Sequence, residues 1–343
     1  MGNYDQMLYG QGYDPFAVSQ AEKKAIKKQM GDTFIMCIIA HVMISVIAMF
    51  IFDLMDAYPG YEFRTADNGL SIMDWQYSLA GSMPSIIMCT VLFLFDKFTN
   101  KIKMDDYLRT DRMGGSFIPL FLCVLAFGYV TSILIQLLVT AGFNAFDYSP
   151  MNENYYFETD LTPAYLAQEV LTTIVLAPIA EELMFRGVVL RRLSKVSRRF
   201  GIIVSAMFFG LMHGNLLQTI LGFIIGVIFA YADIKAGSLL PSIIGHMFVN
   251  GSAVAMSFVE YFAGEQASTM AWTIMLIMFF IIGAIFALVL FFGKKIRFPE
   301  STEYHRKRTV PIMVTCISFW IIMAFYIVDV ITAMGPLTDI MKE

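Results

Sequence analysis

The chain has 343 residues, of which 57% are hydrophobic and only 15% are charged, and its mean hydropathy is +0.65. A soluble globular domain carries about 25% charged residues, so this composition excludes an ordinary soluble protein. The formal net charge of −4 excludes nothing by itself, because in a membrane protein the position of the charges carries the information. We expect an all-α polytopic membrane bundle with eight or nine transmembrane helices, since one crossing needs roughly 20 apolar residues.

The first 33 residues are polar and predict a cytosolic N-terminal tail. Ser19 followed by Glu22 has the pattern of a capping box, which opens a short helix. Four lysines follow on that helix, Lys23, Lys24, Lys27 and Lys28. They either lie on anionic lipid headgroups or only form the positive flank of the first membrane helix.

Apolar runs then follow one another to the end of the chain, and each is a candidate membrane segment. They fall at about 34–52, 78–95, 116–141, 164–190, 201–213, 217–232, 239–259, 269–293 and 309–333. The run at 201–213 is too short for a full crossing and meets the next run at Gly214-Asn215, a turn signal. These two runs therefore form either two spans or a hairpin within the membrane, and the count is eight or nine accordingly.

The basic residues gather in every second connection between these runs. All but Arg64 and Lys342 of the 24 lysines and arginines lie on one side if the chain crosses the membrane once per run. The loops at 53–77 and 142–162 are acidic instead. By the positive-inside rule the N-terminus is cytosolic and the protein is a multi-pass protein of the cell membrane.

Small residues recur every fourth position on one helix, at Gly222, Gly226 and Ala230. This spacing predicts close packing against a neighbouring helix rather than chemistry. His41 stands alone on the first helix and is interpreted as a packed or interhelical hydrogen-bonding residue.

Ionisable residues are rare inside the runs, and each is a functional-site hypothesis because burying it in a bilayer is costly. The run at 164–190 carries Glu169, Glu181, Glu182 and Arg186, the next ends in His213, and the run at 239–259 contains His246 and Asn250. With a helical rise of about 1.5 Å per residue, Glu181, His213 and His246 lie roughly 15, 18 and 13 Å from the cytosolic surface. Similar depth on three helices predicts one shared, buried site.

Helical spacing also indicates which of these residues share a face. His246 and Asn250 are four residues apart, as are Phe209 and His213. Glu182 and Arg186 have the same spacing and are expected to form a salt bridge. Glu181 points about 100° away from Glu182, which leaves it free to face the histidines.

Three short motifs carry a family resemblance. Glu181 to Arg186 reads EExxxR, Phe209 to His213 reads FxxxH, and His246 to Asn250 reads HxxxN. In this order on successive membrane helices they resemble the type II CAAX prenyl endopeptidases and their bacterial Abi-like relatives, the CPBP intramembrane protease family. The resemblance covers residues 160–255, including Pro178. It defines a catalytic helical core between N-terminal helices at 34–159 and C-terminal helices at 256–343.

The resemblance implies an endopeptidase that cleaves a membrane-associated peptide or protein with an activated water. Glu181 would be the general base, His213 would orient the water, and His246 and Asn250 would donate hydrogen bonds to the oxyanion. Glu182, Arg186 and Phe209 would support the site. The family chemistry needs no metal, although Glu181, His213 and His246 could alternatively bind zinc with an open position for water.

Membrane lipids and a peptide or membrane-protein substrate, lipidated or not, are the expected partners, and no nucleic-acid partner is expected. The alternative functions are a non-catalytic membrane scaffold or bacteriocin-immunity protein with the same fold, and a transporter that relays protons. A transporter would show two similar halves, and the sequence has no convincing internal repeat.

Overall fold

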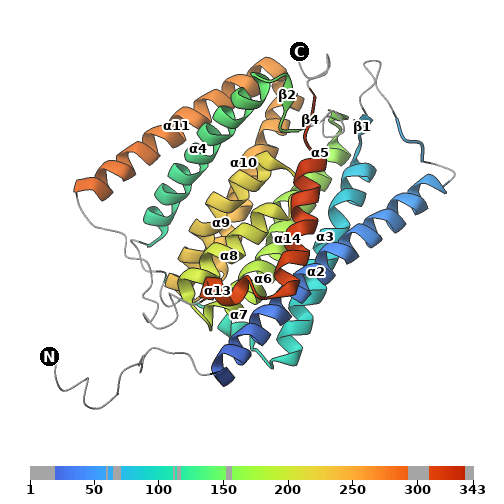
Figure 1. Cartoon of the computed structure of the whole chain (residues 1–343). Helices are drawn as coiled ribbons and strands as arrows, with labels where there is room; N and C mark the ends of the chain where they lie inside the picture. The colour runs from blue at the N-terminus through green and yellow to red at the C-terminus, as the bar shows by residue number, and fades with distance from the viewer. Residues whose placement is uncertain are drawn as a thin grey trace, which may run out of the picture.

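A computed structural model describes residues 20–58, 61–64, 71–110, 113, 117–151, 157–292 and 309–336. The described chain is an all-α bundle (Figure 1), as predicted. The longer helices are α2 (Gln20–Asp56), α3 (Trp75–Thr99), α4 (Phe117–Asn144), α8 (Arg198–Leu211), α9 (Leu216–Ala236), α10 (Leu240–Ala263), α11 (Glu265–Phe292) and α14 (Ile317–Thr332). The shorter elements are η1 (Met104–Asp106), α5 (Pro163–Glu169), η3 (Val170–Leu176), α6 (Ala177–Met184), η4 (Phe185–Leu190), α7 (Arg191–Ser194) and α13 (Thr309–Met313).

Six helices of the described residues are long and apolar enough to cross a membrane: α2, α3, α4, α9, α10 and α11. Helix α14 is apolar but has only 16 residues, and α8 has 14. The apolar run at 164–190 is helical throughout but is divided among α5, η3, α6 and η4. The polytopic bundle is therefore confirmed, while the count of eight or nine spans stays a prediction.

Short strand pairs join the loops at one end of the bundle. β1 (Ser71–Met73) pairs in parallel with β3 (Phe157–Thr159), and β2 (Tyr148–Ser149) pairs antiparallel with β4 (Gly335–Pro336). At two or three residues each, these strands tie loops together and add no layer to the bundle.

The N-terminal basic segment does not form a separate short helix as predicted. Ser19, the expected cap, lies outside the described residues, and from Gln20 onward the chain continues as one helix of 37 residues to Asp56. The four lysines of the segment lie on the first turns of α2, where nothing interrupts the backbone hydrogen bonding between the polar and apolar parts.

The segment that carries the glutamates is a helix with two π-helical stretches. Thr162 caps its start by accepting a hydrogen bond from the Tyr165 N–H, and the π-helical stretches η3 and η4 lie before and after α6. Pro178 in the first turn of α6 lacks an N–H, and its ring would clash with the carbonyl four residues earlier in a regular α-helix. The wider π turn of η3 relieves that clash, and such π segments are common at functional sites.

Helices α8 and α9 pack against each other and are joined by the turn that the Gly214-Asn215 signal predicts. Gly214 has a left-handed φ of +69°, and the Asn215 side chain caps α9 by accepting from the Gln218 N–H at 2.9 Å. The two helices touch through their glycines, since a Cβ added to Gly210 would lie 2.5 Å from the Thr219 carbonyl oxygen. A Cβ on Gly222 would lie 2.8 Å from the Gly210 Cα, which confirms the predicted small-residue packing.

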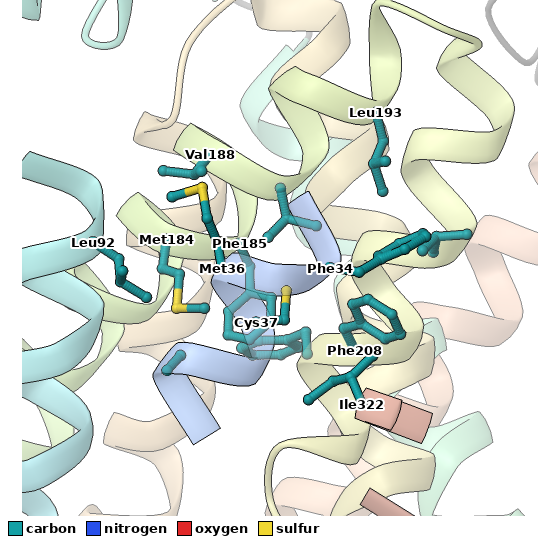
Figure 2. Packing of buried hydrophobic residues seen from close by; sticks show 14 of the residues in the cluster. Phe34, Met36, Cys37, Leu92, Met184, Phe185, Val188, Leu193, Phe208 and Ile322 are labelled. Carbon is teal, nitrogen blue, oxygen red and sulfur yellow. The ribbon is translucent and has the colours of Figure 1, made fainter. Parts of the chain in front are cut away.

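A hydrophobic core forms where α2, α3, α6, η4, α8 and α14 meet (Figure 2). The Phe34 ring contacts Phe208 and Phe319, each with ring centroids 5.6 Å apart. A second cluster joins α4, α9 and α11, whose first and last helices lie side by side in Figure 1. His246 of α10 contacts both clusters, through Phe209 of the first and Phe229 of the second.

Candidate active site

Glu182 and Arg186 form a fully buried ion pair on the helical segment that follows Pro178. The Arg186 Nε lies 3.0 Å from the Glu182 Oε2, and both side chains have an exposed fraction of 0%. The Arg186 Nη2 also donates to the Gly226 carbonyl on α9 at 3.3 Å. The predicted salt bridge is therefore present, and the hydrogen bond from Arg186 to Gly226 links η4 to α9.

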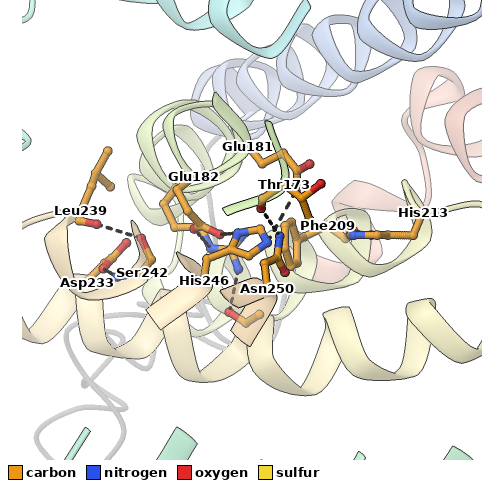
Figure 3. A network of polar contacts seen from close by, with 12 residues as sticks. Thr173, Glu181, Glu182, Phe209, His213, Asp233, Leu239, Ser242, His246 and Asn250 are labelled. Atoms are coloured by element: carbon orange, nitrogen blue, oxygen red, sulfur yellow. Dashed lines mark hydrogen bonds and ion pairs between the residues drawn. The ribbon is translucent and has the colours of Figure 1, made fainter. Parts of the chain in front are cut away.

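His246 on α10 lies between the two glutamates (Figure 3). Its Nδ1 is 2.9 Å from the Glu182 Oε1, and its Nε2 is 3.9 Å from the Glu181 Oε2. The Glu181 Oε2 is buried and accepts no hydrogen bond from any described residue. Glu181 thus presents an unsatisfied carboxylate oxygen toward the imidazole, while Glu182 is neutralised by its partners.

Aromatic rings close this cluster on two sides. The Arg186 guanidinium carbon lies 4.3 Å from the Phe209 ring centroid and 5.7 Å from that of Phe229. Phe209 meets the His246 ring edge to face at 5.4 Å, and Phe229 lies 5.9 Å from the same ring. The expected position of Phe209 as a wall of the cluster is observed, whereas Phe229 was not singled out from the sequence because an aromatic residue in an apolar helix carries no distinguishing signal.

His213 contacts the Phe209 ring, which in turn contacts His246. The His213 Nδ1 is 2.9 Å from the Phe209 carbonyl oxygen, and its ring packs edge to face on the Phe209 ring at 5.3 Å. No hydrogen bond or ion pair joins Glu181 to His213 within the described part of the chain. The histidine beside Glu181 is therefore His246 in this structure.

Asn250 lies one turn beyond His246 and is held by η3. Its Nδ2 donates to the Thr173 carbonyl at 2.9 Å. The reason is local: the Ala177 N–H donates to the Thr172 carbonyl, and the next residue, Pro178, has no N–H to give to Thr173. The asparagine amide thus satisfies a carbonyl that the proline leaves without a backbone donor.

Further polar residues beside the cluster were missed from the sequence. Asp233 on α9 is 4% exposed, and its Oδ1 accepts the Ser242 N–H at 3.0 Å (Figure 3). Asp233 lies at the end of an apolar run beside Lys235, so it reads as an ordinary loop charge in the sequence. The available signal was its position four residues before Gly237, the glycine that ends α9, which keeps Asp233 within the helix.

The residues proposed for a zinc site are not arranged as one. Within the described residues, no group of three or more His, Cys, Asp or Glu side chains is placed to hold a metal ion. Glu181 and His246 are close enough to bind the same ion, and the bond of the His213 Nδ1 to the Phe209 carbonyl leaves the Nε2 of that ring as its possible metal-binding atom. The described side chains do not surround a common ion as they stand, and metal dependence stays a prediction.

The arrangement suits proton transfer to and from a small polar molecule between Glu181 and His246. Phe209 and Phe229 cover two sides of the cluster and its residues are buried, so electrostatic interactions inside it are stronger than in water. The carboxylate supplies a base, and the nearby amide of Asn250 supplies a neutral donor.

Comparison with known proteins identifies the same part of the chain. The sequence model of one protein family, described as "Type II CAAX prenyl endopeptidase Rce1-like", matches residues 163–252. No curated protein and no solved structure matches the chain. The matched residues run from the start of α5 to α10 and include all three motifs. Over this segment the chain is similar to the type II CAAX prenyl endopeptidase family, which confirms the resemblance carried by its motifs.

Proposed function

We propose that the chain is an intramembrane endopeptidase that hydrolyses a peptide bond with a water activated by Glu181 and His246. The observation that carries this proposal is the pair itself: an unsatisfied carboxylate oxygen 3.9 Å from an imidazole nitrogen, buried between helices that an ordinary membrane bundle would pack with apolar residues. The family match over 163–252 supports the reaction class.

The hydrogen bonds of both histidines indicate which ring nitrogen is protonated. The Phe209 carbonyl and the Glu182 carboxylate only accept hydrogen bonds, so Nδ1 of His213 and Nδ1 of His246 each donate. In the neutral ring, Nε2 then keeps a lone pair. For His246 this lone pair faces the Glu181 carboxylate, so two acceptors oppose each other.

A water molecule resolves that opposition by donating one hydrogen to each acceptor. A spacing of 3.9 Å allows one oxygen to lie within hydrogen-bond distance of both atoms. The lone pairs of this water then point away from the pair, toward a bound peptide carbonyl. We therefore propose that His246 orients the water. His213 would support the site through Phe209, in place of the water-orienting role expected from the resemblance.

The proposed reaction balances on these groups. The water oxygen bonds to the peptide carbonyl carbon while Glu181 takes one of its protons. The oxyanion accepts a hydrogen bond from the second N–H of Asn250, since the first is held by the Thr173 carbonyl. The C–N bond then breaks, the amine nitrogen takes the proton from Glu181, and a carboxylic acid and an amine leave.

The substrate we propose is a membrane-associated peptide or protein, lipidated or not, reached from the cytosolic side of the cell membrane. This orientation rests on the charge pattern, which puts the N-terminus and the basic end of α7 in the cytosol. Lipids surround the bundle, because apolar side chains on the outward faces of its helices are widely exposed.

The test is cleavage of a quenched-fluorescence library of membrane peptides by the purified chain in detergent, with and without a strong chelator. Wild type is compared with Glu181→Gln, which keeps the size of the side chain and removes the base. Glu169→Gln is the matched control, because Glu169 lies on the same helical segment but accepts a hydrogen bond from Ser78 on α3 at 2.7 Å.

Cleavage by wild type and Glu169→Gln, lost in Glu181→Gln and resistant to chelator, is the expected result. The loss should be roughly 10²-fold to 10⁴-fold, the usual range for a general base. Cleavage that is lost with chelator and recovered with zinc would support the protease function but overturn the metal-free activation of the water. Equal cleavage by both glutamine variants would sink Glu181 as the base, and cleavage by none of the proteins would favour the scaffold or immunity function.

A further inference from the structure

A cationic cavity lies at the end of the bundle that the charge pattern places in the cytosol. It has a volume of about 280 Å³ and lies between the start of α2, the end of α3 and α7. Its charged lining residues are Lys28, Asp32, Asp96, Arg191, Arg192 and Lys195. One water takes about 30 Å³ in the liquid, so the cavity has room for a hydrated polyatomic ion.

One wall of the cavity is fixed by a buried ion pair. Asp96 is 2% exposed, and its Oδ1 accepts from the Arg192 Nη2 at 2.5 Å, the Arg192 Nε at 2.7 Å and the Asn100 Nδ2 at 2.8 Å. The Gln29 Nε2 donates to the Arg192 backbone carbonyl at 2.5 Å, which ties α2 to α7. Asp96 and Arg192 therefore neutralise each other and hold the three elements together.

The remaining lining charges are mostly positive. Lys28, Arg191 and Lys195 oppose a single further carboxylate, the exposed Asp32. Arg191 is positioned by the Tyr107 ring, whose centroid lies 5.0 Å from the guanidinium carbon. Lys28 and Lys195 form no ion pair with another residue in the described ranges. The lining residues that the structure describes thus carry excess positive charge.

The cavity also lies at one level of the bundle. Its α2 residues directly precede the apolar run at 34–52, its α3 residues directly follow the run at 78–95, and its α7 residues directly follow the run at 164–190. Three apolar segments therefore end beside the cavity. The ends of membrane-spanning segments lie at the level of the lipid headgroups. Basic pockets between membrane helices on the cytosolic side suit phosphate-bearing headgroups.

We propose that this cavity binds the phosphate group of an anionic phospholipid headgroup through Lys28, Arg191 and Lys195. This proposal does not depend on the proteolytic function, because none of these residues contacts the Glu181–His246 pair.

The test is a titration of the full-length chain in detergent with phosphatidylglycerol, followed by native mass spectrometry. Phosphatidylcholine, which carries the same phosphate beside a positive charge, and inorganic phosphate as a competitor are the other arms. The test variant is Lys28→Gln/Lys195→Gln. Its matched control is Lys23→Gln/Lys24→Gln, which removes two exposed charges from the same end of the chain but outside the cavity lining.

The expected result is one phosphatidylglycerol that binds wild type more tightly than phosphatidylcholine does. Lys28→Gln/Lys195→Gln should weaken it roughly 30-fold, about five-fold for each lysine, and the control by less than about three-fold. Lys28→Arg/Lys195→Arg keeps the charge and should retain the affinity, which separates lost binding from misfolding. Displacement of the lipid by millimolar inorganic phosphate would show that the cavity binds phosphate but that its ligand is a soluble ion, which would overturn the lipid assignment. Equal losses in both glutamine variants, or equal binding of the two lipids, would overturn the proposal.

Discussion

The imidazole of His246 reaches across from α10 so that its Nε2 lies 3.9 Å from the Oε2 of Glu181 on α6. The other nitrogen of the same ring binds Glu182, so a single histidine connects a neutralised carboxylate and an unsatisfied one. This relationship places His246, and not the His213 expected to orient the water, beside the candidate base.

Replacing each histidine by alanine should therefore have different consequences. His246→Ala should abolish cleavage and also destabilise the protein, because it removes the water partner and leaves the Glu182 Oε1 without its donor. His213→Ala should lower kcat less, since His213 contacts the site only through Phe209. We would measure kcat/KM together with thermal unfolding in detergent. An intact Tm in His246→Ala, or a larger activity loss in His213→Ala, would contradict the assignment.

Replacing one residue of the Glu182–Arg186 pair should strongly destabilise the protein. Replacing both should destabilise it by less than the two single losses added together. Glu182→Gln or Arg186→Met alone leaves one buried charge, with an expected loss of about 3–5 kcal/mol in the free energy of unfolding. The double variant leaves no unpaired charge, so its loss should be smaller than the sum of the single losses. Equilibrium unfolding in mixed micelles measures all three, and strictly additive losses would argue that the pair is not coupled.

Pro178 should act on catalysis through Asn250. Pro178→Ala restores an N–H that can bind the Thr173 carbonyl, which frees the Asn250 amide from its anchor. We expect kcat to fall by roughly 10-fold to 100-fold, because a misplaced oxyanion donor loses much of its effect, while Tm stays equal or rises. The double variant Pro178→Ala/Asn250→Ala should be no worse than Asn250→Ala. Unchanged kcat in Pro178→Ala, with a loss in Asn250→Ala, would refute the link.

The close approach of α8 and α9 should make Gly210 intolerant of a side chain. Gly210→Ala places a Cβ 2.5 Å from the Thr219 carbonyl oxygen, and overpacking of this kind costs typically about 1–3 kcal/mol. Gly142→Ala on α4 is the matched control, because a Cβ there meets nothing within 4 Å. Thermal unfolding should show a lower Tm for the first variant only, and equal Tm values would mean that the hairpin adjusts without cost.

Cysteine labelling checks the orientation. In a cysteine-free background, Lys195→Cys after α7 should react with an impermeant thiol reagent only once the cells are permeabilised. Phe146→Cys, beyond the end of α4 and 85% exposed, should react in intact cells. The reverse pattern would invert the topology and place substrate entry on the outer side.

The sequence by itself determined the class of the protein and the residues of the candidate site. Long apolar runs predict membrane helices, because backbone groups in lipid must be satisfied within the helix. The turn at Gly214 and the spacing of Glu182 and Arg186 are local features, and both appear as predicted. Local geometry of this kind depends on neighbours within a few residues, which the sequence displays directly.

Only the tertiary structure decided which residues meet. The period of a helix tells which side chains share its face, but the rotation and height of one helix against another depend on packing summed over the whole contact surface. For this reason the motifs could not show that His246 rather than His213 lies beside Glu181, or that the phase shift in η3 turns the Thr173 carbonyl toward Asn250. The cationic cavity was hidden for the same reason, because Lys28, Asp96 and Arg191 are far apart in the chain and come together only where three helices end.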